Sequence, residues 1–226
     1  MTHPMIARFV LWMMLLAALL FWPAGTLDWP GAWVFLSEFV IVTFAIGLWL
    51  AQHNPDLLKE RMRGRVFGKG QVFWDKIYMA FMTIAWCAWI VLMALDAKRW
   101  AVSYMPNELV GTGAVLLLVG FFIVWLTFRE NSFASPVIKI QEERKQTVVT
   151  TGPYRIVRHP MYVGASIYMI GIPLLLGSWL GFACLPLLIG ALVLRIYIEE
   201  DTLRKGLPGY VEYTERVRYR LVPYVW

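Results

Sequence analysis

The chain of 226 residues contains few of the side chains that cross-link small proteins or bind metals. Its two cysteines, Cys87 and Cys184, both lie in apolar runs, which argues against a disulfide framework and a thiolate metal site. Its three histidines show no Cys/His spacing, so no metal is expected. Charged residues make up 16% of the chain and apolar residues 59%, whereas soluble domains are about 45–50% apolar. A soluble enzyme, a secreted disulfide module and a disordered chain are all poor interpretations of this composition.

Long apolar runs dominate the sequence and predict membrane-spanning helices. A helix needs ~20 apolar residues to cross a bilayer, where its backbone groups find no partners outside the helix. Six such runs cover approximately Met5–Trp22, Trp33–Ala51, Val72–Leu95, Leu109–Phe128, Met161–Leu176 and Trp179–Ile198. The predicted fold is therefore an all-α, polytopic integral membrane helix bundle. The first run also resembles the apolar core of a signal peptide, and this alternative stays open.

The distribution of basic residues predicts how the bundle is oriented. Cytoplasmic loops of membrane proteins are rich in Lys and Arg. With the N-terminus inside, all of the 21 Lys and Arg residues except Lys98 and Arg99 fall on the inner side. The prediction is an N-in, C-in topology, and the net charge of +6 then indicates cytoplasmic loops rather than nucleic-acid binding. The compact loops favour a bacterial inner membrane, with the active site facing the cytoplasm.

Two regions of different character follow from this topology. Residues 1–128 hold four spans and form the predicted N-terminal transmembrane region. Residues 129–226 hold an inner loop, a tight hairpin of spans five and six, and a polar tail, which together form the predicted catalytic and cofactor-binding region. The basic segment Asn54–Gln71 has apolar residues at helical spacing and is expected to lie on the anionic inner leaflet.

The densest polar cluster, Thr150–Tyr162, leads into span five. His159 precedes a proline and is biased away from helical backbone angles, whereas Pro160 suits the first position of a helix. The free backbone N–H groups that follow Pro160, together with the helix dipole, would form an anion site, to which Arg158 and His159 add donors. A carboxylate or phosphate of a cofactor fits this site. An ordinary basic flank before a proline-started helix is the alternative.

A second cluster, Arg195 to Glu200, closes span six. Arg195 and Glu199 are four residues apart and share one helical face. Ionisable residues at the end of a spanning helix usually face a cavity or the bundle interior, although a simple ion pair between these two is the alternative. Because the connection between spans five and six is short, the two clusters are predicted to meet in space.

Several motifs of the second half occur together in one known family. Gly152–Tyr162 contains the sequence Arg-His-Pro-x-Tyr and is followed by Glu199-Glu200, Leu203 and a Gly-Tyr-x-Glu-Tyr sequence at residues 209–213. In this combination, the part of the chain from Arg129 to Trp226 resembles the isoprenylcysteine carboxyl methyltransferases, which sit within a wider group that includes the phospholipid methyltransferases. The first four spans show only general similarity, and there we expect acceptor specificity to differ.

The resemblance implies S-adenosyl-L-methionine as the cofactor, held at the cytoplasmic membrane boundary by a site that is not a Rossmann fold. The residues that it implies for cofactor binding are Gln141, Gln146, Thr147, Val148, Val149, Tyr154, His159, Pro160, Met161, Tyr162 and Glu199. Arg195 would face the methyl acceptor, so that Arg195 and Glu199 are the catalytic candidates. The residues agree with this: the methionyl carboxylate fits the helix start at Pro160, and Glu199 offers negative charge to the rest of the cofactor.

The implied methyl acceptor is a lipid or a small hydrophobic molecule that enters from the membrane. A carboxylate acceptor is already ionised at pH 7 and needs no general base, and Arg195 would orient it through two parallel hydrogen bonds. An amine acceptor would need to lose a proton, for which Glu199 or Glu200 are the nearby candidates. A prenylated cysteine, a phospholipid amine and a thiol all stay open. The terminal run Tyr219–Trp226 is a candidate lid over the cofactor.

Two other functions are consistent with parts of the sequence. Membrane sterol reductases carry a similar Arg-His-Pro sequence, so an NADPH-dependent reductase is an alternative, although such enzymes have more spans. A scaffold or transporter is less favoured, because the first four spans contain few ionisable residues, chiefly Glu38, Asp75 and Lys76. An ion-coupled transporter usually needs more polarity near the membrane midplane.

Overall fold

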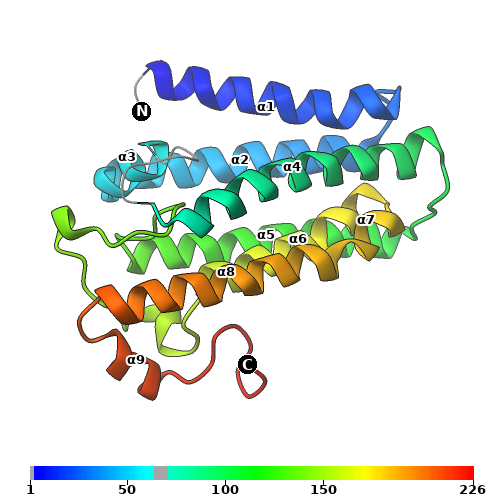
Figure 1. Cartoon of the computed structure of the whole chain (residues 1–226). Helices are drawn as coiled ribbons and strands as arrows, with labels where there is room; N and C mark the ends of the chain where they lie inside the picture. Colours follow the sequence, from blue (N-terminus) through cyan, green and yellow to red (C-terminus); the bar gives the residue numbers. More distant parts are fainter. Residues whose placement is uncertain (1–2, 64–70) are drawn as a thin grey trace.

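The computed structural model describes residues 3–63 and 71–226, and within these ranges it contains helices and no strands (Figure 1). The α-helices are α1 (His3–Ala24), α2 (Pro30–His53), α3 (Pro55–Arg63), α4 (Phe73–Ala94), α5 (Asn107–Glu130), α6 (Pro160–Leu176), α7 (Trp179–Ala183), α8 (Leu185–Gly206) and α9 (Tyr210–Arg216). A π-helical turn, η1 (Leu95–Arg99), continues α4, and two short 3-10 turns, η2 (Glu142–Arg144) and η3 (Gly152–Arg155), lie in the loop before α6.

Five helical stretches of the described chain are long and apolar enough to cross a membrane, namely Met5–Ala24, Pro30–His53, Phe73–Arg99, Asn107–Glu130 and Trp179–Gly206. The predicted all-helical membrane bundle is thereby confirmed. The predicted fifth span is present as α6, but α6 has 17 residues and is shorter than the others. The count of six spans is therefore approximate.

The predicted sixth span is interrupted rather than continuous. α7 ends at Ala183 and α8 begins at Leu185, with Pro186 in the first turn of α8. A proline lacks the backbone N–H and its ring clashes with the carbonyl group four residues earlier, here that of Phe182. The break therefore falls where Pro186 requires it, and the chain reverses between α6 and α8 through the short α7.

α5 and α6 pack against each other along most of their length, because glycines let their backbones approach. A Cβ atom added to Gly120 would lie 2.6 Å from the carbonyl oxygen of Gly164, and one added to Gly171 would lie 2.6 Å from that of Gly113. Small residues at such crossings are typical of helix packing in lipid. The boundary at residue 128 falls inside α5, which packs on α6, so the division into residues 1–128 and 129–226 stays a prediction about function.

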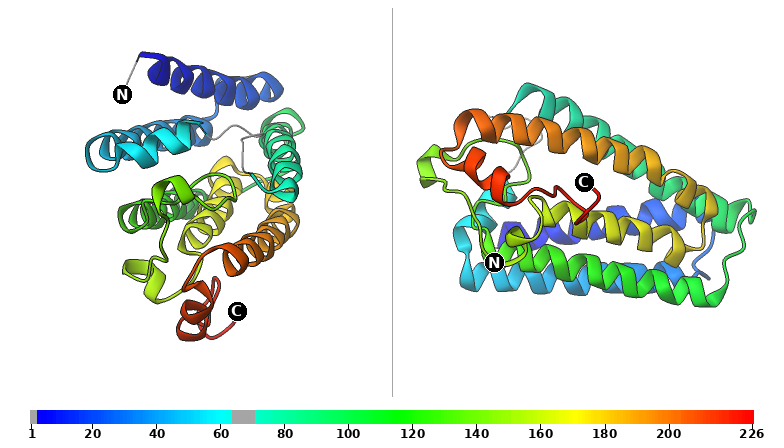
Figure 2. Two further views of the ribbon diagram at one scale, coloured as in Figure 1. Left: turned by 60° about the vertical axis from the view of Figure 1, so that its left-hand side comes forward. Right: turned by 90° about the horizontal axis from the view of Figure 1, so that it is seen from below.

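The helices run side by side, so that their ends gather at two opposite ends of the molecule (Figures 1 and 2). α3, the start of α6, the end of α8 and α9 lie at one end, which carries most of the basic residues, while η1 with Lys98 and Arg99 lies at the other. This separation of the basic loops from the loop that holds Lys98 and Arg99 agrees with the predicted topology. That the basic end faces the cytoplasm stays a prediction.

The short helix α3 lies at the same end as the polar loops. Asn54 caps it by accepting a hydrogen bond from the Leu57 backbone N–H at 3.2 Å, and the Leu57 side chain is fully buried. Arg61 donates to the carbonyl oxygen of Ala134 at 2.8 Å. α3 is therefore docked onto the loop that follows α5. Residues 64–70 of the predicted surface segment lie outside the described residues.

Candidate active site

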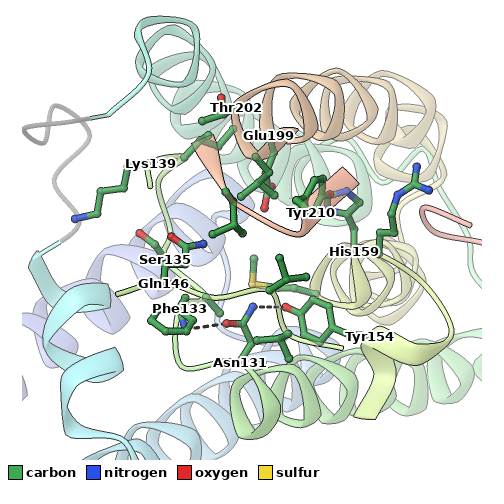
Figure 3. Close-up of a pocket in the computed structure, with 18 of the residues that line it drawn as sticks. Asn131, Phe133, Ser135, Lys139, Gln146, Tyr154, His159, Glu199, Thr202 and Tyr210 are labelled. Atoms are coloured by element: carbon green, nitrogen blue, oxygen red, sulfur yellow. Dashed lines mark hydrogen bonds between the residues drawn. The ribbon is translucent and has the colours of Figure 1, made fainter. Parts of the chain in front are cut away.

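A cavity opens at the basic end of the bundle, between α6, α8, α9 and the loop from α5 to α6 (Figure 3). It takes in about 870 Å³ of space, a volume that includes open solvent. The residues that line it are Asn131, Phe133, Ala134, Ser135, Val137, Ile138, Lys139, Gln146, Thr147, Val148, Val149, Tyr154, Arg158, His159, Met161, Tyr162, Arg195, Glu199, Thr202, Leu203, Leu207, Tyr210 and Tyr213. The two predicted clusters therefore do meet in space.

The loop before α6 folds back on the end of α5 through a tight turn. Gly152 has a φ of +56°, and a Cβ atom there would lie 2.3 Å from the Cγ atom of Glu130, so glycine is required. Thr151 Oγ1 donates to Glu130 Oε2 at 2.9 Å, and Asn131 Nδ2 donates to the Tyr154 hydroxyl at 2.7 Å. Figure 3 shows the Asn131–Tyr154 pair at the edge of the cavity.

α6 begins as predicted, with His159 at the N-cap and Pro160 at the first helical position. The chain just before it is held by the C-terminal tail: the backbone N–H groups of Arg158 and His159 donate to the carbonyl oxygens of Tyr219 and Arg220 at 2.9 and 3.0 Å. None of residues 219–226 lines the cavity. The tail therefore fixes the start of α6 from outside the cavity, in place of the lid position considered from the sequence.

Glu200 binds three basic side chains, of which Arg158 and His159 line the cavity. Its Oε1 accepts from Arg158 Nε at 2.7 Å and lies 3.2 Å from His159 Nε2, while its Oε2 accepts from Arg220 Nε at 3.2 Å. Arg158 Nη1 also donates to the carbonyl oxygens of Val217 and Arg218. Two of the three Arg158 guanidinium nitrogens, Nε and Nη1, are thus bound by the protein, and the role of this side chain as a donor for an anion stays a prediction.

Glu199, next in sequence, extends from α8 into the cavity (Figure 3). It accepts a hydrogen bond from the Tyr162 hydroxyl at 2.5 Å. Among the described lining residues Glu199 is the one carboxylate, and no Lys or Arg of the described chain lies within 4.0 Å of it. The ion pair with Arg195 that the sequence allowed is therefore not formed.

The basic side chains that line the cavity, in contrast, all have carboxylate partners. Lys139 Nζ lies 2.8 Å from Glu60 Oε1, and Arg195 Nε lies 3.1 Å from Asp75 Oδ1. Arg158 is paired with Glu200, as described above. Among the described residues, the cavity therefore offers one carboxylate without a cationic partner, which suits a ligand that carries positive charge.

Arg195 forms the wall of the cavity nearest the bundle interior. Its Nη2 donates to the carbonyl oxygen of Pro136 at 2.6 Å, and its guanidinium lies 5.1 and 5.9 Å from the ring centroids of Tyr78 and Tyr162. Cation–π contacts of this kind hold a guanidinium plane in place. Arg195 is therefore fixed between α4, α6 and α8.

Tyrosine hydroxyls surround the remaining part of the cavity. The Tyr213 hydroxyl donates to the Tyr154 carbonyl oxygen at 2.8 Å, whereas the buried Tyr210 hydroxyl has no hydrogen-bond partner in the described structure. Burial raises the pKa of the Tyr154, Tyr210 and Tyr213 phenols, so all three remain protonated donors at neutral pH. An unpartnered buried hydroxyl on a cavity wall is free to bind a ligand.

Of the predicted site residues, Gln146 to Val149, Tyr154, His159, Met161, Tyr162, Arg195 and Glu199 line the cavity. Gln141 and Pro160 do not. The buried Gln141 side chain donates from Nε2 to the Phe133 carbonyl oxygen at 2.7 Å and holds the loop, and Pro160 begins α6. Three further lining residues, Asn131, Tyr210 and Tyr213, were not predicted from the sequence, although Tyr210 and Tyr213 belong to the Gly-Tyr-x-Glu-Tyr motif.

Two comparisons show which proteins the sequence is similar to. Residues 109–208 match the family model described as phospholipid methyltransferase. A curated relative, Protein-S-isoprenylcysteine O-methyltransferase B of Arabidopsis thaliana, is 26% identical over 141 residues, which cover 62% of this chain and 68% of the relative. Both names describe methyltransferases, and neither favours the reductase alternative.

The fold also has a counterpart among solved structures. The eukaryotic intramembrane Ras methyltransferase ICMT (isoprenylcysteine carboxyl methyltransferase) matches with a TM-score of 0.55 and 18% identity, over 99% of this chain and 88% of that one. In sequence and in fold, the chain is thus similar to integral membrane methyltransferases. More particularly, the chain is similar to the isoprenylcysteine carboxyl methyltransferases within the wider group of membrane methyltransferases.

Proposed function

We propose that the protein transfers a methyl group from S-adenosyl-L-methionine to the carboxylate of a hydrophobic, membrane-embedded acceptor. The observation that carries the proposal is Glu199, the cavity carboxylate without a cationic partner among the described residues. S-adenosylmethionine bears positive charge on its sulfonium and its ammonium group. The similarity to methyltransferases supports the same cofactor.

The residues of the cavity fit this cofactor. The Tyr210 hydroxyl is a buried donor without a partner among the described residues, and Glu199 supplies negative charge. Gln146 to Val149 and Tyr154 would border the adenosyl part, and the backbone at His159 to Tyr162 would take the methionyl carboxylate at the start of α6. When bound, S-adenosylmethionine supplies a methyl group on a positively charged sulfur, which is already a good leaving group.

The work left to the protein is to hold an acceptor oxygen in line with that methyl group. A carboxylate is ionised at neutral pH, so no base is needed, and well-oriented reactants can gain ~7–11 kcal/mol of the barrier. Arg195 is suited to hold the carboxylate, because its Nε and Nη2 are bound by Asp75 and Pro136 while Nη1 donates to no described residue. We therefore assign acceptor binding to Arg195.

The position of Arg195 also supports a hydrophobic acceptor. It lies where α4, α6 and α8 meet, next to the rings of Tyr78 and Tyr162, so an acceptor headgroup there would keep its apolar part among spanning helices. The curated relative is named for isoprenylcysteine, and a prenylated cysteine carboxylate is the acceptor class we propose first. We further propose a bacterial inner membrane location with the cavity facing the cytoplasm, from the basic residues at that end.

The test uses the full chain purified in detergent. Calorimetry is expected to show binding of S-adenosylmethionine and none of NADPH; the reverse would contradict the proposal. Tritiated cofactor is then supplied with N-acetyl-S-farnesylcysteine, with phosphatidylethanolamine vesicles, or with a lipid extract of the host. A carboxyl methyl ester releases labelled methanol in base, whereas an N-methyl group does not. Base-labile label supports a carboxylate acceptor, and base-stable label on the vesicles would replace it with an amine.

A further inference from the structure

A fully buried carboxylate, Asp75 on α4, lies behind Arg195. Its Oδ1 accepts a hydrogen bond from Arg195 Nε at 3.1 Å. Its Oδ2 accepts one from the Ile138 backbone N–H and one from Gln71 Nε2, each at 2.8 Å. One side chain therefore joins three segments that are distant in sequence: α4, the cavity-lining loop and α8.

These contacts determine the direction of the Arg195 guanidinium. Asp75 holds Nε, the Pro136 carbonyl oxygen holds Nη2 at 2.6 Å, and the Tyr78 and Tyr162 rings flank the group. Nη1 has no acceptor in the described structure, and Arg195, to which it belongs, lines the cavity. Because a guanidinium is planar, fixing two of its nitrogens also fixes the third.

A buried ion pair is weak evidence for stability, because an apolar pair of similar volume packs as well. A pair whose arginine lines a cavity has another use, which is to present that arginine to a ligand in one orientation. The matched family model covers residues 109–208, so it includes Arg195 and leaves out Asp75. Asp75 belongs to the first four spans, in which the sequence predicted no catalytic or cofactor-binding residue.

We propose that Asp75 is a positioning residue for methyl transfer. It holds the Arg195 guanidinium so that the free Nη1 edge meets the acceptor carboxylate, and Ile138 keeps the cavity-lining loop in register with the same carboxylate. The inference rests on the proposed function, since the acceptor carboxylate is part of that proposal. Asp75 itself touches neither cofactor nor acceptor, and it acts through Arg195.

The test compares Asp75→Asn, which removes the charge, with Asp75→Glu, which keeps the charge but displaces it. With tritiated cofactor and N-acetyl-S-farnesylcysteine, each variant is expected to lower kcat by up to about 10²-fold, since a displacement of about 1 Å has effects of this size. The Kd for S-adenosylmethionine is expected to stay within about twofold. In the Arg195→Gln background, Asp75→Asn is expected to lower kcat no further, because the residue acts through Arg195.

A readout without any acceptor keeps this test separate from that of the proposed function. Phenylglyoxal modifies arginine, and peptide mass spectrometry reports the rate at Arg195. Removing the charge that binds Nε by Asp75→Asn is expected to raise that rate by about tenfold. An unchanged rate would overturn the proposal whether or not the wild type methylates the acceptor, whereas an inactive wild type with the expected change in rate would count against the proposed function alone.

The matched control is Asp96→Asn, a fully buried carboxylate that follows α4 at its other end and lies far from the cavity. It is expected to lower Tm without changing kcat or the reactivity of Arg195. Asp75 variants with wild-type kcat would contradict the proposal. Loss of cofactor binding in both Asp75 variants would also contradict it, because the role of Asp75 would then be to hold the fold and not to orient Arg195.

Discussion

The two ends of the α4–η1 helix carry similar buried aspartates in different settings. Asp75 pairs with Arg195 beside a cavity, and both of its oxygens are bound. Asp96 accepts from Ser103, Ser178 and the Leu180 N–H through Oδ2, while its Oδ1 has no partner in the described structure. Asp96 joins the loop before α5 to the α6–α7 turn. The same kind of side chain thus serves structure at one end and can serve chemistry at the other, and the neighbouring cavity makes the difference.

The largest loss of stability is expected at Glu200, which binds three basic side chains. Glu200→Ala leaves Arg158 and its neighbours buried without their counter-charge, and this is expected to lower the free energy of unfolding by about 3–5 kcal/mol. Asp96→Ala, at the opposite end, removes hydrogen bonds from neutral donors and is expected to lower it by about 1–3 kcal/mol. Thermal unfolding in detergent measures both. Equal losses would remove the distinction between the two ends.

The next largest effect is expected on cofactor affinity, and it compares Glu199 with its neighbour Glu200. Glu199→Gln is expected to weaken S-adenosylmethionine binding by about hundredfold, as expected when a charge-assisted bond of roughly 1.5–3 kcal/mol is lost. Its Tm is expected to stay near that of the wild type, since Glu199 pairs with no Lys or Arg among the described residues. Calorimetry measures the affinity, and an unchanged Kd would place the cofactor elsewhere.

A smaller effect is expected from a change that keeps charge. Arg195→Lys preserves the cation but loses the planar fork, so kcat is expected to fall by about tenfold with cofactor affinity within about twofold. Single-turnover measurements with labelled cofactor separate the two quantities. A normal rate would exclude Arg195 from acceptor binding.

The smallest effects compare two tyrosines of α9. Tyr210→Phe removes a hydroxyl with no partner in the described structure, and it is expected to weaken cofactor binding by about three- to tenfold while leaving Tm unchanged. Tyr213→Phe removes the bond to the Tyr154 carbonyl oxygen and is expected to lower Tm instead. If both changes lowered only Tm, the Tyr210 hydroxyl would have no part in the site.

Much of the fold could be predicted from the sequence, because a helix that crosses the bilayer needs an apolar run of a minimum length. The helix start at Pro160 followed from local chemistry. The break before α8 was missed, although Pro186 marked it, because the apolar run continues through Cys184 and hides the interruption.

The site was predictable where its residues lie in one motif or on one helical face, as with His159, Tyr162 and Glu199. The partners of those residues were not, because they are set by packing between distant segments. Asp75 is the clearest example: from the sequence it was an ionisable residue near the end of a span, and its pairing with Arg195 depends on how α4 and α8 lie together.

The most direct test of the account is an experimental structure of the detergent-purified protein with S-adenosylmethionine bound. We expect the ligand inside the cavity, with a positively charged group within 4 Å of the Glu199 carboxylate, as in an ion pair, and with the Tyr210 hydroxyl hydrogen-bonded to it. Ligand density outside this cavity, or a Glu199 side chain turned away from the ligand, would contradict the account.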